Sequence, residues 1–222
     1  GIIVNGKIFG DYVYIQNAGA KGITTTNDIT GRNIYITNDG GSINLNSGKL
    51  SAMSDMNIFN LRNADSINIG ADIEANAISD AILSHILIAN LGKGDLKITG
   101  NLFAKNGIDV KNQIGNVVAN RVGLDGGVIL KVDGFYHDPS VNINADSGIE
   151  ITGNITSNEL VTIQNAGKKG ITMDSNVRAG EFVENESGEM VNQGVISVIN
   201  DGGNINITGG TLEAPTVSIT NT

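Results

Sequence analysis

The sequence predicts an all-β fold, a single-stranded parallel β-helix in which similar coils stack along one axis. Three observations support this fold class: an excess of turn-forming residues, short segments that alternate apolar and polar residues, and a repeat of 21–22 residues. The 222 residues include 30 Gly, 30 Asn and 32 Ile, but only 2 Pro and 4% aromatic residues. Gly and Asn favour tight turns and Ile favours strands, so this composition is typical of many short strands joined by turns.

The repeat starts with an apolar-x-apolar-x-Asn segment, which a glycine-rich turn and two more short apolar segments follow. Its clearest copy spans 34–52, and the stretches 14–24 and 162–172 match each other almost letter for letter. The Asn that ends the first segment recurs at Asn17, Asn38, Asn60, Asn90, Asn112, Asn165, Asn200 and Asn221. The intervals are 21, 22, 30, 22, 53, 35 and 21, and Asn144 divides the 53 into 32 and 21. We therefore predict about nine coils of 21–22 residues, with three insertions.

Alternation with period two indicates strands that have one buried face and one wet face. Each strand has too few inward residues to be stable alone, so we expect the coils to stack and their inward Ile, Leu and Val to form a continuous column. We expect each recurring Asn at a corner, where it stacks on the Asn of the next coil in an amide ladder. A recurring Ala in the third segment, as in Leu50-x-Ala52, predicts the tightest part of the cross-section.

The net negative charge limits the kinds of partner that the chain can bind. The chain has 14 basic and 23 acidic residues, a net charge of -9, which disfavours nucleic acid and anionic membranes as partners. No apolar run reaches the roughly 18 residues that a bilayer-spanning helix needs. The absence of Cys excludes disulfides, thiolate zinc sites and cysteine nucleophiles. We predict no cofactor and no membrane insertion.

The first insertion lies near 76–85. Ile78, Ile82 and Ile86 follow each other at intervals of four, which allows a short helix that covers the flank of the solenoid.

The second insertion lies near 123–139 and predicts a β-hairpin whose turn is the Asp-Gly pair 133–134, between strands at 128–132 and 135–137. The residues after the turn form either a small recognition patch or a decoration that packs on the coil beneath. These candidate partner-surface residues are Phe135, Tyr136 and His137.

The third insertion lies near 181–193 and has four carboxylates in nine residues. Such a run can bind calcium or a basic partner, although the alternating Asp/Asn spacing of a calcium loop is missing, and a solvated loop is the alternative. Its candidate partner-surface residues are Glu184, Glu186 and Glu189.

The sequence lacks several common catalytic motifs. The sequence has no Gly-x-Ser-x-Gly, His-Glu-x-x-His or phosphate-binding Gly-Lys-Ser/Thr loop, and its two histidines, His85 and His137, have no metal-ligand spacing. We therefore do not predict an enzyme. A carbohydrate-active β-helix enzyme stays open as an alternative, because parallel β-helices also carry polysaccharide chemistry.

Repeat units such as 204–214 and 96–102 resemble those of the filamentous haemagglutinin family, the large exoproteins of two-partner secretion, and of related autotransporter passengers. The resemblance covers nearly the whole chain as a style of repeat. It implies a right-handed β-helix, an extracellular or cell-surface location on a bacterium, and export of the full-length parent through an outer-membrane transporter. The family's Asn-Pro-Asn secretion motif is absent, so residues 1–222 are expected to be one internal or distal β-helix segment of a longer protein.

The resulting prediction is a rigid adhesive stalk. It would present binding faces to a surface protein or glycan of host cells or other bacteria. A structural spacer or toxin-delivery stalk and the β-helix enzyme are the alternatives.

Overall fold

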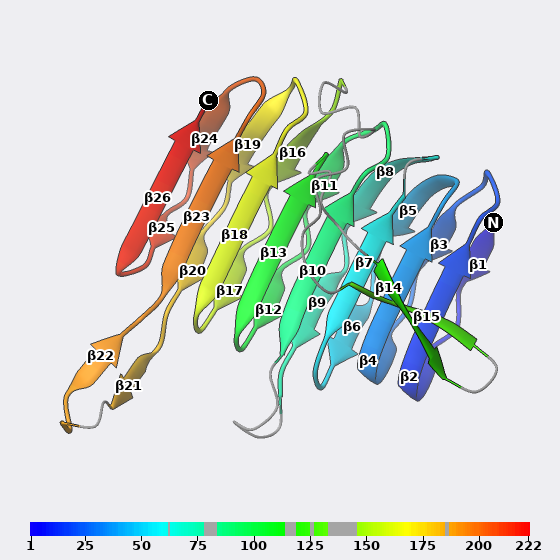
Figure 1. Cartoon of the computed structure of the whole chain (residues 1–222), viewed down its shortest axis with the longest axis horizontal. Coiled ribbons are helices and arrows are strands. Elements are labelled where there is room, and N and C mark those ends of the chain that lie inside the picture. Colours follow the sequence, from blue (N-terminus) through cyan, green and yellow to red (C-terminus); the bar gives the residue numbers. More distant parts are fainter. Residues whose placement is uncertain (62, 78–83, 114–118, 125–126, 133–145, 185–186) are drawn as a thin grey trace.

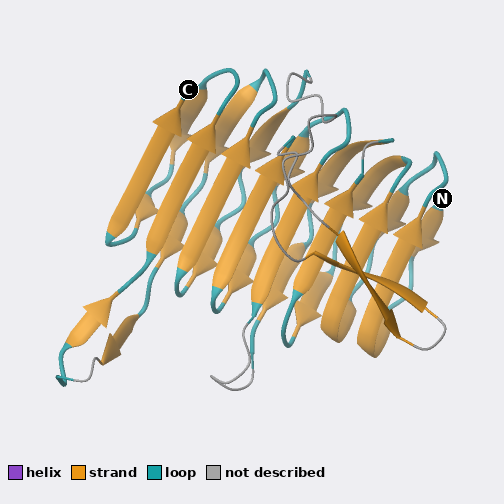
Figure 2. Cartoon of the chain, in the orientation of Figure 1, coloured by secondary structure: helices purple, strands orange, loops and turns teal. Residues whose placement is uncertain are grey.

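The computed structural model describes all residues except 62, 78–83, 114–118, 125–126, 133–145 and 185–186. The described residues form 26 strands and no helix (Figure 2), as the all-β prediction requires. Parallel strands build two large sheets, one of eight and one of 14 strands, and two small hairpins lie outside them. This arrangement is consistent with a parallel β-helix.

The eight-stranded sheet is here named row A, and the 14-stranded sheet supplies two further rows, B and C (Figure 1). Row A consists of β1 (Ile2–Val4), β3 (Ile23–Thr25), β5 (Gly41–Leu45), β8 (Ala64–Ile69), β11 (Leu96–Ile98), β16 (Gly148–Ile151), β19 (Gly170–Asp174) and β24 (Ile205–Gly209). The long strands β2 (Ile8–Asn17) and β4 (Ile29–Asn38) contribute their first residues to row B and their last residues to row C.

The remaining strands divide between these two rows. Row B continues with β6 (Lys49–Ala52), β9 (Asp72–Ala75), β12 (Leu102–Ala104), β17 (Ile155–Ser157), β20 (Val177–Ala179) and β25 (Leu212–Glu213). Row C continues with β7 (Met56–Asn60), β10 (His85–Asn90), β13 (Gly107–Asn112), β18 (Leu160–Asn165), β23 (Val195–Asn200) and β26 (Thr216–Asn221). The chain visits the rows in the order A, B, C, and we call each such passage a coil.

Equivalent residues of successive coils pair in register. In row C, Ile36 pairs with Ile58, which pairs with Ile88, and all three side chains are fully buried. Row A shows the same rule, where Ile43 pairs with Ile67 and Ile67 with Leu96. Because inward side chains of one coil lie on those of the next, the interior is one continuous apolar core.

The predicted amide ladder runs through all eight coils. Each ladder Asn ends its row C strand, and seven hydrogen bonds of 2.6–3.2 Å link the eight side chains in sequence, from Asn17 to Asn221. The six inner ladder residues are completely buried, so these bonds satisfy amides that have no access to water. Within the described residues the chain passes eight times through rows A, B and C, and Asn112 pairs directly with Asn165; Asn144 lies outside the described residues.

A second polar column follows the corner between rows A and B. The backbone N–H of Asn101 donates to the side-chain Oδ1 of Asp72 at 2.9 Å. In the same way, the N–H of Asn154 donates to Asn101 Oδ1 at 3.1 Å, and the N–H of Asn176 donates to Asn154 Oδ1 at 3.2 Å. Each side chain therefore caps a corner N–H of the next coil that would otherwise lack a partner.

Small residues line the corner between rows B and C. Ala52, Ala75 and Ala104 stack in register and are nearly or fully buried, and Ser157 and Ala179 continue the column. A small residue therefore occupies this buried position in five successive coils, and that it marks the tightest part of the cross-section stays a prediction.

The turn from row C to row A depends on glycine at defined places. Gly41 has a φ of 68°, and a Cβ at this position would lie 2.4 Å from the carbonyl oxygen of Ala20 in the preceding coil. Both the backbone angle and the close approach of the coil beneath therefore require glycine.

The three longest stretches between row strands are 76–84, 113–147 and 180–194, and each is described only in part. The short helix expected in the first segment falls on residues 78–83, which lie outside the described residues. Ile86, which fitted the same helical spacing, is a buried core residue of β10 and pairs with Met56 and Ile108.

In the second segment, β15 (Gly127–Val132) pairs antiparallel with β14 (Ala119–Leu124). The partner expected for this strand, 135–137, lies outside the described residues, so the described hairpin precedes the predicted turn instead of spanning it. In the third segment, β21 (Phe182–Glu184) pairs antiparallel with β22 (Met190–Asn192), and the two strands form a hairpin that projects from the coils (Figure 1). The described part of the chain holds no helix with the length and apolar character needed to span a bilayer.

Candidate binding surface

Three tyrosines lie together on the outer side of row C in the first two coils. Tyr12 and Tyr14 are two residues apart on β2 and therefore point to the same side, and Tyr14 pairs in register with Tyr35 on β4. The Tyr14 and Tyr35 ring centroids are 5.1 Å apart with planes at 10°, and those of Tyr12 and Tyr14 are 6.4 Å apart with planes at 3°. We call these three residues the tyrosine platform.

The tyrosine platform is accessible. Tyr12 is 50% and Tyr14 is 38% exposed, and Tyr35 is half-buried between its neighbours. Burial raises the pKa of Tyr14, and the adjacent Tyr12 raises it further. The Tyr14 hydroxyl therefore stays protonated at neutral pH and can donate as well as accept a hydrogen bond.

The surroundings of the tyrosine platform are polar. Arg32 Nε lies 3.4 Å from Asp11 Oδ1, where β4 and β2 pass from row B to row C, and both side chains are more than half exposed. Also on β4, the side-chain oxygen of Asn33 accepts a 3.1 Å hydrogen bond from the backbone N–H of Asp55 in the following coil. An aromatic surface is thus bordered by charged and amide groups, the combination typical of protein binding sites.

The rigidity of this surface follows from the fold. Both strands are held by ladder pairing on the next coil, and a tyrosine side chain has only two rotatable bonds, so little conformational entropy is lost when a ligand binds. The stacked rings together present apolar surface, and their hydroxyl groups can form hydrogen bonds. The tyrosine platform therefore suits a ligand that has an apolar face and hydroxyl groups.

A hollow of about 220 Å³ lies on the outer side of row A, and its lining includes Asp95, Glu150 and Lys169. Lys169 Nζ is 3.0 Å from Asp95 Oδ2, and Lys97 Nζ, from the adjacent strand β11, is 2.8 Å from Glu150 Oε1. Asp95 also accepts the backbone N–H of Gly148 at 2.9 Å and raises the pKa of Lys169. These pairs are exposed and nearly neutralise each other, so the hollow presents a shallow polar surface and no concentrated charge.

A cluster of titratable groups lies in the middle of row C. His85 Nε2 is 3.3 Å and Lys111 Nζ is 3.5 Å from the same Asp109 oxygen, and the side chain of Lys111 is almost fully buried. Burial opposes ionisation of Asp109, but the hydrogen bond from His85 and the charge of Lys111 outweigh it, and the pKa of Asp109 is lowered. Burial lowers the pKa of Lys111 in turn. The cluster therefore holds a charged pair inside the wall of the solenoid.

Of the six candidate partner-surface residues predicted from the sequence, the structure describes two. Phe135, Tyr136, His137 and Glu186 lie outside the described residues. Glu184 ends β21 and pairs in register with Met190, and Glu189 is exposed beside it, so these two acidic residues belong to one hairpin end. Among the residues that the structure describes, no group of three or more His, Asp or Glu side chains is arranged to hold a metal ion.

Sequence reasoning missed the tyrosine platform. A signal was present: Tyr35 follows Tyr14 by 21 residues, the same interval that separates Asn38 from Asn17. Residues at equal distance from the ladder must lie one above the other, so the alignment of the rings could have been predicted. Comparisons with protein-family models, with curated proteins and with solved structures give no match to this chain.

Proposed function

We propose that the chain serves adhesion at the outer surface of a bacterial cell, as a rigid stalk that presents a binding surface to host cells or other bacteria. The observation that carries this proposal is the tyrosine platform, an exposed aromatic surface fixed on a ladder-paired backbone. Exposed aromatic groups with a polar border are a common mark of an interaction site. The ligand that suits it best is a glycan, because a sugar ring combines an apolar C–H face with hydroxyl groups.

The proposed stalk is the stack of coils itself. Eight coils at a strand spacing of about 4.8 Å give a length of roughly 38 Å. We propose that the coils form one right-handed solenoid, since connections between parallel strands are almost always right-handed. Export of a longer parent through an outer-membrane transporter remains part of the proposal.

The test compares the triple variant Tyr12→Ser, Tyr14→Ser, Tyr35→Ser with the unchanged chain in binding to glycan arrays and to immobilised cells. The matched control is Met53→Ser with Leu160→Ser, which removes exposed apolar side chains outside the tyrosine platform. We expect the triple variant to lose at least about tenfold in affinity, as the loss of aromatic hot spots predicts, while its circular dichroism and the binding of the control stay unchanged.

Equal binding by the triple variant would contradict the proposal. Binding to a cell-surface protein but to no glycan would retain adhesion and reject the glycan. Release of sugar from a polysaccharide panel would instead support the carbohydrate-active enzyme, and retention of adhesion after whole coils are deleted would support a spacer.

A further inference from the structure

The charged groups that border the tyrosine platform neutralise each other. Asn33 pairs in register with Tyr12, and the residues that directly precede this pair are Arg32 and Asp11. Arg32 Nε lies 3.4 Å from Asp11 Oδ1, and both side chains are more than half exposed. The guanidinium group therefore already has an anionic partner, and the pair adds no net charge to the border.

The other outward neighbours of the three rings in register are uncharged. Asn57 follows Tyr35 on the next coil, and Gln16 lies two residues after Tyr14 on the same side of β2. Gln16 is exposed, and Asn33 and Asn57 are half-buried. Amide groups both donate and accept hydrogen bonds, so they match the hydroxyl groups of a sugar without attracting a charge.

An acidic ligand fits this border poorly. Among the described residues at the border, the cation is the guanidinium of Arg32, and a ligand carboxylate or sulfate has to compete with Asp11 for it. The whole chain has a net charge of -9, which repels the same ligands at longer range. One unit charge at about 4 Å in water changes an affinity by about fivefold, so the charge of Asp11 is enough to favour a neutral sugar over an acidic one.

We propose that the tyrosine platform selects neutral glycans over glycans that carry a carboxylate or sulfate, and that Asp11 sets this specificity by occupying Arg32. The inference rests on the proposed function, because it names the class of glycan that the tyrosine platform binds. A neutral sugar meets the tyrosines and the amides without disturbing the ion pair, whereas an acidic sugar has to displace Asp11. The selectivity thus comes from a repulsive group as well as from attractive contacts.

Two border variants test the proposal. Asp11→Asn removes the carboxylate that occupies Arg32, and Gln16→Lys adds a second cation at an exposed position of the border. The control for the first is Glu213→Gln, which removes a carboxylate from another exposed arginine pair, in which Arg178 Nε lies 3.9 Å from Glu213 Oε1.

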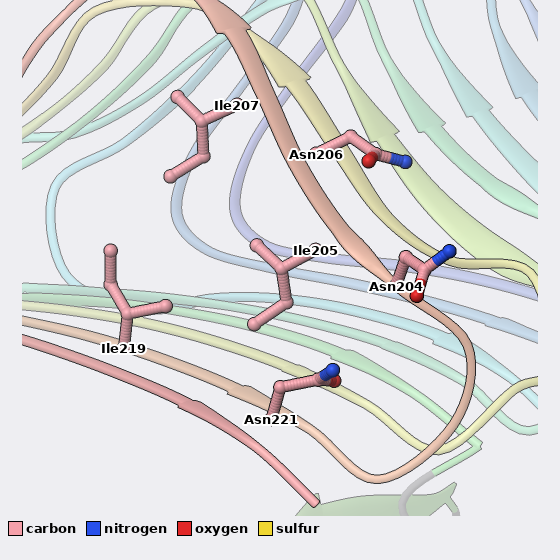
Figure 3. Close-up of a pocket in the computed structure, with 6 residues that line it drawn as sticks. All are labelled: Asn204, Ile205, Asn206, Ile207, Ile219 and Asn221. Carbon is pink, nitrogen blue, oxygen red and sulfur yellow. The ribbon is translucent and has the colours of Figure 1, made fainter.

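The control for the second variant is Asn206→Lys, which adds the same cation to a hollow of about 520 Å³ between β24 and β26 (Figure 3). Like the border amides, the lining of this hollow is uncharged: it consists of Asn204, Ile205, Asn206, Ile207, Ile219 and Asn221. Both control positions lie in the last coil, roughly 29 Å along the stack from the tyrosine platform, where salt with a Debye length of about 8 Å screens their charges.

The measurement is the ratio of affinities within matched glycan pairs, each a neutral oligosaccharide and the same oligosaccharide with a uronic or sialic acid. We expect the unchanged chain to favour the neutral member by at least about fivefold, and each border variant to reduce that ratio by about fivefold. The two controls should keep the ratio of the unchanged chain, and about 1 M salt should abolish the preference, since it shortens the Debye length to about 3 Å. Circular dichroism checks that every variant is folded.

Equal affinity of the unchanged chain for both members of the pairs, or equal changes in the border variants and the controls, would overturn the proposal. A second readout does not depend on adhesion: the ¹⁵N resonance of Arg32 Nε during titration with sodium glucuronate. It should shift at about fivefold lower glucuronate concentration in Asp11→Asn than in the unchanged chain, and identical titrations would overturn the role of Asp11. Absence of binding to every glycan would refute the glycan ligand of the proposed function, and the Arg32 titration would still decide whether Asp11 controls this cation.

Discussion

The ladder residue Asn60 offers the sharpest test of what stabilises this fold. Its side chain is fully buried and makes three hydrogen bonds: it accepts from Asn38 at 2.8 Å and donates to the Ser66 carbonyl at 2.9 Å and to Asn90 at 3.2 Å. At a net value of about 1 kcal/mol for each bond, Asn60→Ala should lower the free energy of unfolding by about 3 kcal/mol.

The control is Asn57→Ala, three residues earlier on the same strand, where the side chain faces outwards and is half-buried. It should change the free energy of unfolding by less than about 0.5 kcal/mol. Urea unfolding followed by circular dichroism measures both variants, and the m-value shows whether the transition keeps its cooperativity. A loss of less than about 1 kcal/mol for Asn60→Ala, or equal losses for the two variants, would refute the stabilising role of the ladder.

Three further predictions concern the turns, the charged cluster and the corner. Gly41→Ala should lower the free energy of unfolding by about 2 kcal/mol or more, because Gly41 has a positive φ and the carbonyl of Ala20 lies close to it. The control Gly6→Ala, whose added Cβ has no atom within 4 Å, should leave the free energy of unfolding unchanged in the same urea titration. The pKa of Asp109 is lowered, so the stability that its ionised form contributes is present above about pH 4 and is lost as the pH falls through the folded pKa. The Asp109→Asn variant should therefore be less stable than the unchanged chain at pH 7, and its stability should decline less steeply in acid. Thermal unfolding measured against pH checks both results. Ala104→Leu should cost about 1–3 kcal/mol, because the corner column has no space for the added atoms, and an unchanged unfolding midpoint would contradict that tight packing.

The repeating part of the fold was predictable because the same physical constraint recurs in every coil. The Asn intervals placed the ladder, and the recurring Ala placed the column of small residues at the corner, since residues at equal distance from a corner must stack. Asn144, which the same intervals placed on the ladder, lies outside the described residues, and the described ladder passes directly from Asn112 to Asn165.

The tyrosine platform was harder to predict because its outward residues repeat only once, from Tyr14 to Tyr35, whereas the ladder Asn recurs in every described coil. The search for aromatic groups therefore concentrated on the insertion at 135–137, where aromatic residues are adjacent in sequence, and overlooked Tyr12, Tyr14 and Tyr35, which the stacking of coils brings together. Ile86 shows the related difficulty for core residues next to an insertion, where strand and helix periodicities coincide over a few residues.

Distances between spin labels along row C test the stacking of coils most directly. Tyr35, Asn57, Leu87 and Ser218 occupy the same outward position in different coils, and the chain has no natural Cys that would interfere with labelling. With one label at Ser218, double electron–electron resonance should give about 19 Å to Leu87, 24 Å to Asn57 and 29 Å to Tyr35, a rise of about 4.8 Å for each added coil. Distances that do not increase by a constant step in this order would contradict the stacked coils.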